Sequence, residues 1–398
     1  MLKRFVLACA VVGTLGYALT AISPERLSSV AKARHSMGFF PFETVAFAQA
    51  AKPPMSEQAF KNITVLKGIP VDEFMGTMGL FSAALNVCCG DCHVGAGGSN
   101  PDWASDAKPT KVTARKMVTM VNNINKQNFG GAQVVTCWSC HRGSEFPSTT
   151  PPLDSVYGEA AVVPRDVLPA AGPNAGAPTV DQLLDKYVTA LGGAQRLAAI
   201  TSFTETGTSH LFDESVNDPA EVYAKAPNNL AVYVHQREGD LARVEKGTTA
   251  AWVMLPLTVV GKYQLNAGAL EGAKFDAQLA FPLGLKSFFK NWHAIYPSSI
   301  NGKDVYGIQG GGNGLVATLY FDKQTGLLTR AIRYANSAIG RVPTQIDYDD
   351  YRPEGGIMMA HKFNYSWISG REEYEISKVT LNAPVDDAKF NEPAQRAK

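Results

Sequence analysis

The sequence predicts a multidomain α+β protein: an N-terminal all-α part, then a mostly antiparallel curved β-sheet, half-barrel-like, with a packing helix. Three observations support this fold class. Residues 55–145 have helical apolar periodicity, and residues 179–398 contain repeated segments that alternate apolar and polar positions. Between them, residues 146–178 are rich in Pro, Ala and Gly without periodicity, which is typical of a linker. At 398 residues, the chain is long enough for this arrangement.

The N-terminal residues 1–48 have the pattern of an export segment. Lys3 and Arg4 precede an uncharged apolar run at residues 5–22, and a small-x-small site lies at 46–48. The run has about the minimum length that spans a bilayer. Two interpretations stay open, a signal peptide cleaved near Ala48 and a retained membrane anchor. In both, we expect the rest of the chain in the periplasm.

Composition and cysteine usage narrow the function further. The chain has 37 Lys and Arg against 36 Asp and Glu, a net charge of +1, so we expect no nucleic-acid binding, which needs a basic excess. Five of its six cysteines lie in two short clusters, and none follows Cys140. A disulfide framework would spread cysteines through the fold, so these clusters have another role.

Both clusters contain the pattern C-x-x-C-H. The first is Cys89, Cys92 and His93, and the second is Cys137, Cys140 and His141. Two thiols one helical turn apart can each form a thioether with a haem vinyl group, and the adjacent histidine then ligates the iron. The sequence therefore predicts two covalently bound haem c groups, held by these four cysteines, with His93 and His141 as metal ligands.

Zinc and redox alternatives match the two clusters less well. A zinc ribbon brings its C-x-x-C pairs closer together and needs no histidine after each pair. A thioredoxin-like pair occurs once, in a βαβ setting. The remaining cysteine of the first cluster, Cys88, is expected to be a buried thiol beside the haem.

Methionines in the preceding helices are candidates for the sixth ligand of each iron. Phe74, Met78, Phe81 and Leu85 share one helical face, and this places Met78 ahead of the first motif. Met117 lies ahead of the second motif, with Met120 as the second candidate. Core packing is the alternative role for each methionine. Outside the motifs, residues 55–145 contain no histidine.

The second domain, residues 179–398, begins with an expected helix at 179–191 that ends at a Gly-Gly pair. Alternating segments predict strands, and a short polar turn ending in Gly326 predicts a hairpin. The expected strands lie at 220–226, 230–236, 250–256, 315–321, 327–334, 343–351, 361–368 and 372–381.

Residues 57–145 resemble the cytochrome c subunit family of photosynthetic reaction centres, and are closer still to its two-haem relatives. The matching segments are FKNITVLKGIPVDEFMGTMGLFSAALNVCCGDCH and TARKMVTMVNNINKQNFGGAQVVTCWSCHRG. In that family a helix before each motif supplies an axial methionine, which the resemblance maps onto Met78 and Met117. The sheet part is similar in architecture to the open half-barrel of lipoprotein-carrier proteins.

Together these features predict an electron carrier, not an enzyme: a periplasmic dihaem c-type cytochrome, with residues 5–22 as the candidate anchor. It would pass single electrons between redox protein partners. Two alternatives stay open. One is a peroxidase-like haem enzyme with one open iron site. The other is a binding module whose β domain holds an apolar ligand or a partner.

Overall fold

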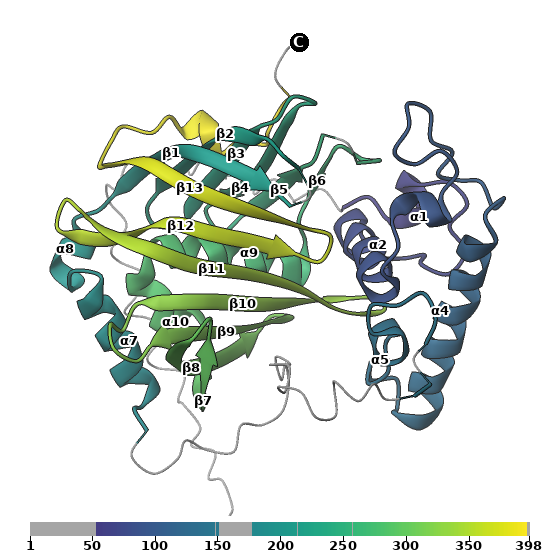
Figure 1. The fold of residues 1–398 in the computed structure, drawn as a ribbon, viewed down its shortest axis with the longest axis horizontal. Coiled ribbons are helices and arrows are strands. Elements are labelled where there is room, and N and C mark those ends of the chain that lie inside the picture. The colour runs from purple at the N-terminus through teal and green to yellow at the C-terminus, as the bar shows by residue number, and fades with distance from the viewer. Residues whose placement is uncertain (1–52, 148, 151–176, 213, 257, 396–398) are drawn as a thin grey trace, which may run out of the picture. The chain divides into compact units, whose positions relative to one another are not determined.

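The computed structural model describes residues 53–147, 149–150, 177–212, 214–256 and 258–395 (Figure 1). It contains helices and one large antiparallel sheet, which confirms the predicted α+β class. The predicted export segment 1–48 and most of the linker 146–178 lie outside the described residues. No helix in the described part is long and apolar enough to cross a membrane.

Two longer and three short helices make up the first part of the chain. They are α1 (Ser56–Ala59), α2 (Val71–Leu85), α3 (Cys89–Cys92), α4 (Pro109–Asn128) and α5 (Cys137–His141). Helix α2 begins after Pro70, has acidic residues in its first turn, and ends at Asn86 in the left-handed conformation. Helix α4 begins with Pro109, whose fixed φ suits the first helical position.

Thirteen strands form a single sheet after residue 200 (Figure 1). They are β1 (Ser202–Leu211), β2 (Asn217–Lys225), β3 (Asn229–His235), β4 (Asp240–Lys246), β5 (Ala250–Met254), β6 (Lys262–Gln264), β7 (His293–Ile300), β8 (Lys303–Gly312), β9 (Leu315–Asp322), β10 (Leu328–Ser337), β11 (Gly340–Glu354), β12 (Ile357–Trp367) and β13 (Gly370–Leu381). The eight predicted strands are confirmed, and the structure adds β1, β4, β6, β7 and β8.

The sheet consists of two meanders, β1 to β6 and β7 to β13. The pairing of β1 with β13 joins them. From one edge the strand order reads β6 to β1, then β13 down to β7, with every pair antiparallel. A bulge lies in the central β1–β13 pair beside Gly207. A Cβ there would lie 2.1 Å from the carbonyl oxygen of Glu375, so only glycine fits.

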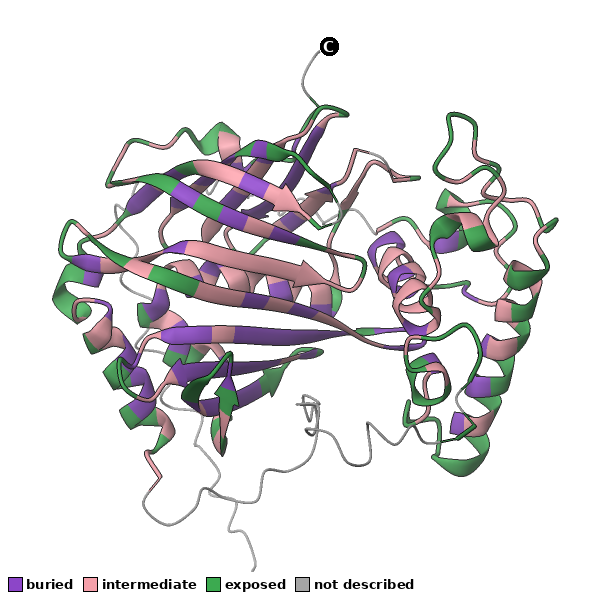
Figure 2. Ribbon diagram, viewed as in Figure 1, coloured by how far each residue is buried: buried purple, intermediate pink, exposed green. Residues whose placement is uncertain are grey.

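Helices cover one face of the sheet and complete its core. The predicted helix is confirmed as α7 (Val180–Ala190), capped by Thr179 with Gln182. The sequence did not predict α9 (Ala267–Ala280), which joins the two meanders and contacts strands of both, β3 to β5 and β9 to β10. Two short helices, α8 (Ala194–Ala198) and α10 (Leu285–Phe288), flank them. Buried residues run along β9 and β10 (Figure 2), where Phe275 and Tyr187 pack.

The turn between β10 and β11 packs against the helical part. Ile339 of this turn belongs to the same buried cluster as Phe74 of α2 and Cys137 of α5. The side chain of Gln133 donates to the carbonyl oxygen of Ser337 at 2.9 Å. A cluster of buried side chains therefore connects the turn between β10 and β11 with helices α2 and α5.

Candidate functional site: the two cysteine motifs

The first motif forms the single turn of helix α3. The backbone N–H of Cys88 donates to Asp91 Oδ2 at 2.8 Å, and the N–H of His93 donates to the carbonyl oxygen of Cys89 at 2.8 Å. This turn brings Cys89 and Cys92 to the same side of the helix. The expectation that Cys88 is buried is wrong. It is the exposed N-cap residue, and its thiol lies 3.2 Å from Asp91 Oδ2.

A backbone carbonyl fixes the imidazole of His93. Its Nδ1 lies 3.1 Å from the carbonyl oxygen of Trp103, and the two rings lie 5.2 Å apart. A carbonyl oxygen only accepts hydrogen bonds, so Nδ1 carries the proton and donates. Nε2 is left with its lone pair free, as a metal ligand requires. Burial lowers the pKa of His93, which favours the neutral ring.

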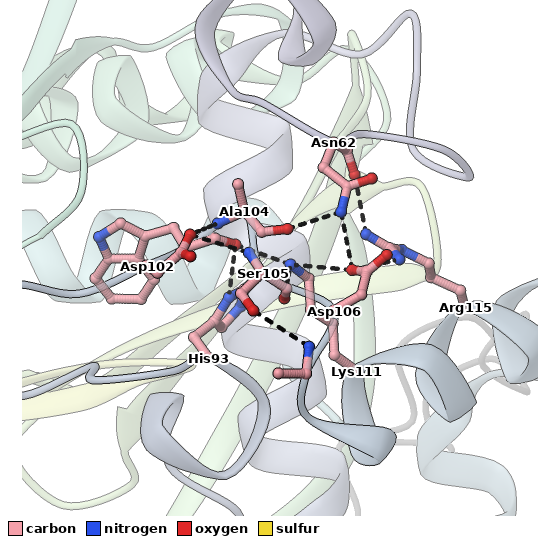
Figure 3. Close-up of polar contacts among 10 residues, drawn as sticks. Asn62, His93, Asp102, Ala104, Ser105, Asp106, Lys111 and Arg115 are labelled. Carbon is pink, nitrogen blue, oxygen red and sulfur yellow. Dashed lines mark hydrogen bonds and ion pairs between the residues drawn. The ribbon is translucent and has the colours of Figure 1, made fainter.

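The loop that supplies the Trp103 carbonyl is held by a polar network (Figure 3). Lys111 donates to the same carbonyl oxygen at 2.8 Å. Asp106 accepts from Arg115 at 2.8 Å and from Asn62 at 2.9 Å. These bonds hold the pKa of Asp106 low, at about 2. Because Arg115 donates to the Asp106 carboxylate, Arg115 helps to hold the loop that contains Trp103.

The second motif forms helix α5 and repeats this arrangement. After His141, Arg142 and Gly143 both take positive φ values, 52° and 82°, and turn the chain back. The N–H of Gly143 donates to Ala84 of α2 at 3.0 Å. The turn places the carbonyl oxygen of Ser144 3.0 Å from Nδ1 of His141. Nε2 of His141 is therefore also free of its proton and available as a ligand.

A buried amide fixes the segment before the second motif. Asn125 of α4 is 4% exposed. Its Oδ1 accepts from the N–H groups of Val134 at 3.2 Å and Val135 at 2.9 Å, and its Nδ2 donates to the Val135 carbonyl at 2.7 Å. This one side chain satisfies three backbone groups next to Cys137.

All four motif cysteines are free thiols, as thioether formation requires. Cys89 and Cys140 are exposed, whereas Cys137 is buried and Cys92 is partly buried. Burial raises the pKa of Cys92 and of Cys137. Within the described ranges, no three His, Cys, Asp or Glu side chains converge to hold a metal ion. The donors fit a c-type haem: paired thiols on one turn, each followed by an imidazole with Nε2 free.

The candidate methionines differ in their surroundings. Met78 is partly buried and packs with the cluster that contains Cys137, and it lines the same cavity as Cys89. Met117 is partly buried on α4, whereas Met120 is 44% exposed. For the second iron, this burial favours Met117 over Met120, since an axial thioether has to be shielded from water. Ligation by either methionine stays a prediction.

Sequence patterns did not indicate the groups that hold the histidines. Trp103 and Ser144 act through main-chain oxygens, which any residue type supplies. Asn125 carried the one available signal, a polar residue on the face of α4 that also carries Val118 and Val121. A buried asparagine at such a position indicates a fixed backbone segment nearby.

Comparison with known proteins confirms the resemblance noted for the cysteine-bearing part. Residues 9–163 match the model of the family described as photosynthetic reaction centre cytochrome C subunit. The photosynthetic reaction center cytochrome c subunit of Thermochromatium tepidum is 34% identical over 111 residues, 27% of this chain and 26% of that protein. Its counterpart in Rubrivivax gelatinosus is 34% identical over 98 residues, 24% and 25% of the two chains. The chain thus matches about a quarter of each relative.

Solved structures match about half of this chain. A LolA superfamily protein from Nitrosomonas europaea matches 54% of this chain and 98% of its own, at 16% identity and a TM-score of 0.35. A putative outer membrane lipoprotein-sorting protein domain from Vibrio parahaemolyticus matches 52% and 97%, at 12% identity and a TM-score of 0.35.

Proposed function

We propose that the chain is a dihaem c-type cytochrome that passes single electrons between redox protein partners on the extracytoplasmic side of a membrane. One observation carries this proposal. Both motif histidines donate from Nδ1 to a main-chain carbonyl, at 3.1 Å for His93 and 3.0 Å for His141, and both leave Nε2 for a metal. A histidine placed beside two cysteines by chance would not repeat this bond.

Each motif would hold one haem. Cys89 with Cys92, and Cys137 with Cys140, would supply the thioether sulfurs, and His93 and His141 would each bind an iron through Nε2. Met78 and Met117 are the proposed sixth ligands. Bound haem iron supplies a one-electron couple, because it alternates between the ferric and ferrous states.

The chain's own residues would set the properties of these sites. The carbonyl oxygens of Trp103 and Ser144 hold each ring in one tautomer and orientation, and the bond makes Nε2 a stronger donor. A stronger donor favours ferric iron and lowers the reduction potential. The supports of these carbonyls, Lys111 and Asp106 at one motif and Gly143 at the other, limit ligand movement during electron transfer.

The proposed carrier needs both axial positions filled, which separates it from a peroxidase-like enzyme with one open site. The export pattern at residues 1–48 and covalent haem attachment both fit the periplasm, with residues 5–22 as the candidate anchor. The proposed partners are redox proteins, membrane-bound or soluble.

The test is haem counting in matched variants, produced in a host that matures c-type cytochromes. The wild-type chain should carry two covalent haems, and the double variant Cys137→Ala/Cys140→Ala should carry one. Cys88→Ala is the matched control and should keep both, because Cys88 lies outside the C-x-x-C-H pattern. Binding of carbon monoxide by the protein in its ferrous state would contradict the carrier and favour the enzyme.

A further inference from the structure

A large cavity lies between the sheet and its covering helices. Its volume is about 970 Å³, at the upper end of the range for small-molecule sites. Apolar side chains from the sheet and from helix α9 make up much of its wall, among them Phe203, Val222, Leu279, Ile346 and Met359. Such a wall favours an occupant with a long apolar body.

Two arginines line this cavity, and each is bound to a carboxylate. Arg243 Nη2 donates to Glu372 at 2.8 Å, and the guanidinium carbon Cζ of Arg243 lies 4.1 Å from the ring centre of Tyr365. Arg333 donates to both oxygens of Asp276 at 2.8 Å. Both cations are therefore neutralised by the chain itself and offer no unpaired charge to an anionic ligand.

Besides Asp276, four carboxyl groups line the cavity, those of Asp72, Glu73, Glu205 and Glu245. Glu245 is 3% exposed, and within the described structure neither of its oxygens has a hydrogen-bond partner. Glu205, on β1, is 7% exposed. Desolvation raises the pKa of Glu245 to about 9 and that of Glu205 to about 8, so both are uncharged at pH 7. The charged groups that act on Glu245 are Asp276, Lys274, Arg333 and Glu271.

A buried group without a partner calls for an explanation, and a ligand supplies one here. A protonated carboxyl donates from its O–H, so Glu245 suits an oxygen that accepts a hydrogen bond. A carboxylate or phosphate ligand would lie among these carboxyl groups with no unpaired cation, which disfavours it. The cavity therefore suits an uncharged amphiphile.

Met75, Met78 and Cys89 also line the cavity, and Cys89 belongs to the first C-x-x-C-H motif. An occupant would thus lie beside the site of the first haem. Among uncharged amphiphiles, a quinone is the class that exchanges electrons with such a site. The choice of a quinone over another neutral amphiphile rests on the proposed function, whereas the preference for an uncharged ligand does not.

We propose that the cavity binds a neutral quinone with an apolar tail, and that a carbonyl oxygen of its ring accepts a hydrogen bond from Glu245. The apolar tail lies along the wall that Phe203 and Leu279 provide. This assigns a ligand to the β domain and places it next to the electron-carrying part.

Isothermal titration calorimetry on the full chain at pH 7 tests this with three probes that share a ten-carbon tail: a decyl benzoquinone, 1-decanoyl glycerol and decanoate. We expect the quinone to bind at least about tenfold more tightly than decanoate. Equal or tighter binding of decanoate overturns the uncharged-ligand inference. Tighter binding of the glyceride overturns the quinone assignment, and absence of quinone binding overturns the whole proposal.

Variants locate the ligand within the cavity. Glu245→Ala should weaken quinone binding about fivefold through loss of one hydrogen bond, whereas Glu245→Gln, which keeps a neutral donor, should stay near the wild-type value. Ala273→Trp, which fills the cavity from α9, should abolish binding, and Glu214→Gln on the exposed surface is the matched control. Unchanged binding in Ala273→Trp, with circular dichroism confirming its fold, overturns the location. Haem content is measured on the same samples, so a chain without haem contradicts the proposed function independently of the binding result.

Discussion

His141 donates from Nδ1 to the carbonyl oxygen of Ser144 at 3.0 Å, three residues further along the chain. The bond depends on the turn at Arg142 and Gly143, both with positive φ. His93 makes the equivalent bond to Trp103, ten residues away, by a differently built loop. Two unrelated backbone paths thus give the same imidazole tautomer, which indicates that the tautomer matters to function.

Gly143→Ala tests the turn. A Cβ at this positive φ strains the backbone, and we expect a loss of about 1 kcal/mol in the free energy of unfolding, measured by urea denaturation. Because the turn positions Ser144, the reduction potential of one haem should also shift. Gly68→Ala is the control: its φ is 76° with no atom within 4 Å of the added Cβ. It should lose similar stability with no change in potential, and equal potentials in both variants would count against the role of the turn.

Asn125→Ala tests the support of the second motif. It leaves the N–H groups of Val134 and Val135 without their side-chain acceptor, so we expect a loss of about 2–3 kcal/mol in unfolding free energy. Asn128→Ala on the exposed side of the same helix removes one exposed bond and should cost less than about 0.5 kcal/mol. Similar losses in the two variants would contradict the role of Asn125 in holding the segment before Cys137.

Met78→Ala tests whether Met78 is the sixth ligand of one haem iron. We expect it to remove part of the far-red absorption band that reports sulfur bound to ferric haem, and to lower the reduction potential. Met75→Ala, one turn earlier on α2, is the matched control and should keep the band. A band that survives in Met78→Ala and disappears in Met75→Ala would reassign the ligand.

Glu245 should make stability depend on pH. Its pKa is raised from 4.5 to about 9 in the folded chain, so the folded state holds a proton that the unfolded state has lost between these values. Stability then falls as pH rises through this window, by up to about 1.4 kcal/mol per pH unit, and levels off above the folded pKa. Glu245→Gln should reduce the slope between pH 6 and pH 8 in urea denaturation. Parallel slopes for the two proteins would show that Glu245 is not protonated in the fold.

The parts of this molecule that were predictable are those whose chemistry requires particular residue types. Thioether attachment needs C-x-x-C-H as a contiguous pattern, so the sequence alone indicates Cys89 to His93 as a candidate haem site, and attachment there stays a prediction. The exposed position of Cys88 was not predictable, because its role as N-cap of α3 depends on where that turn begins. The carbonyls of Trp103 and Ser144 carry no residue-type signal.

The same reasoning applies to the fold. Strands with one covered face alternate visibly, and α7 has a capping box at Thr179, so these elements were predictable. Helix α9 was not, because its sequence AGALEGAKFDAQLA is rich in Ala and Gly, and the residues that it buries include Gly268, Gly272 and Ala277. Small buried residues give little apolar periodicity.

The central claim is that each C-x-x-C-H motif holds one low-spin haem through its histidine. The most direct measurement is the haem content per chain together with the optical and magnetic spectra of the purified protein. The account predicts two covalent haems per chain, both low-spin, and one after Cys137→Ala/Cys140→Ala. A chain that carries no covalent haem, although it was produced in a host that attaches haem to other C-x-x-C-H proteins, would contradict the account.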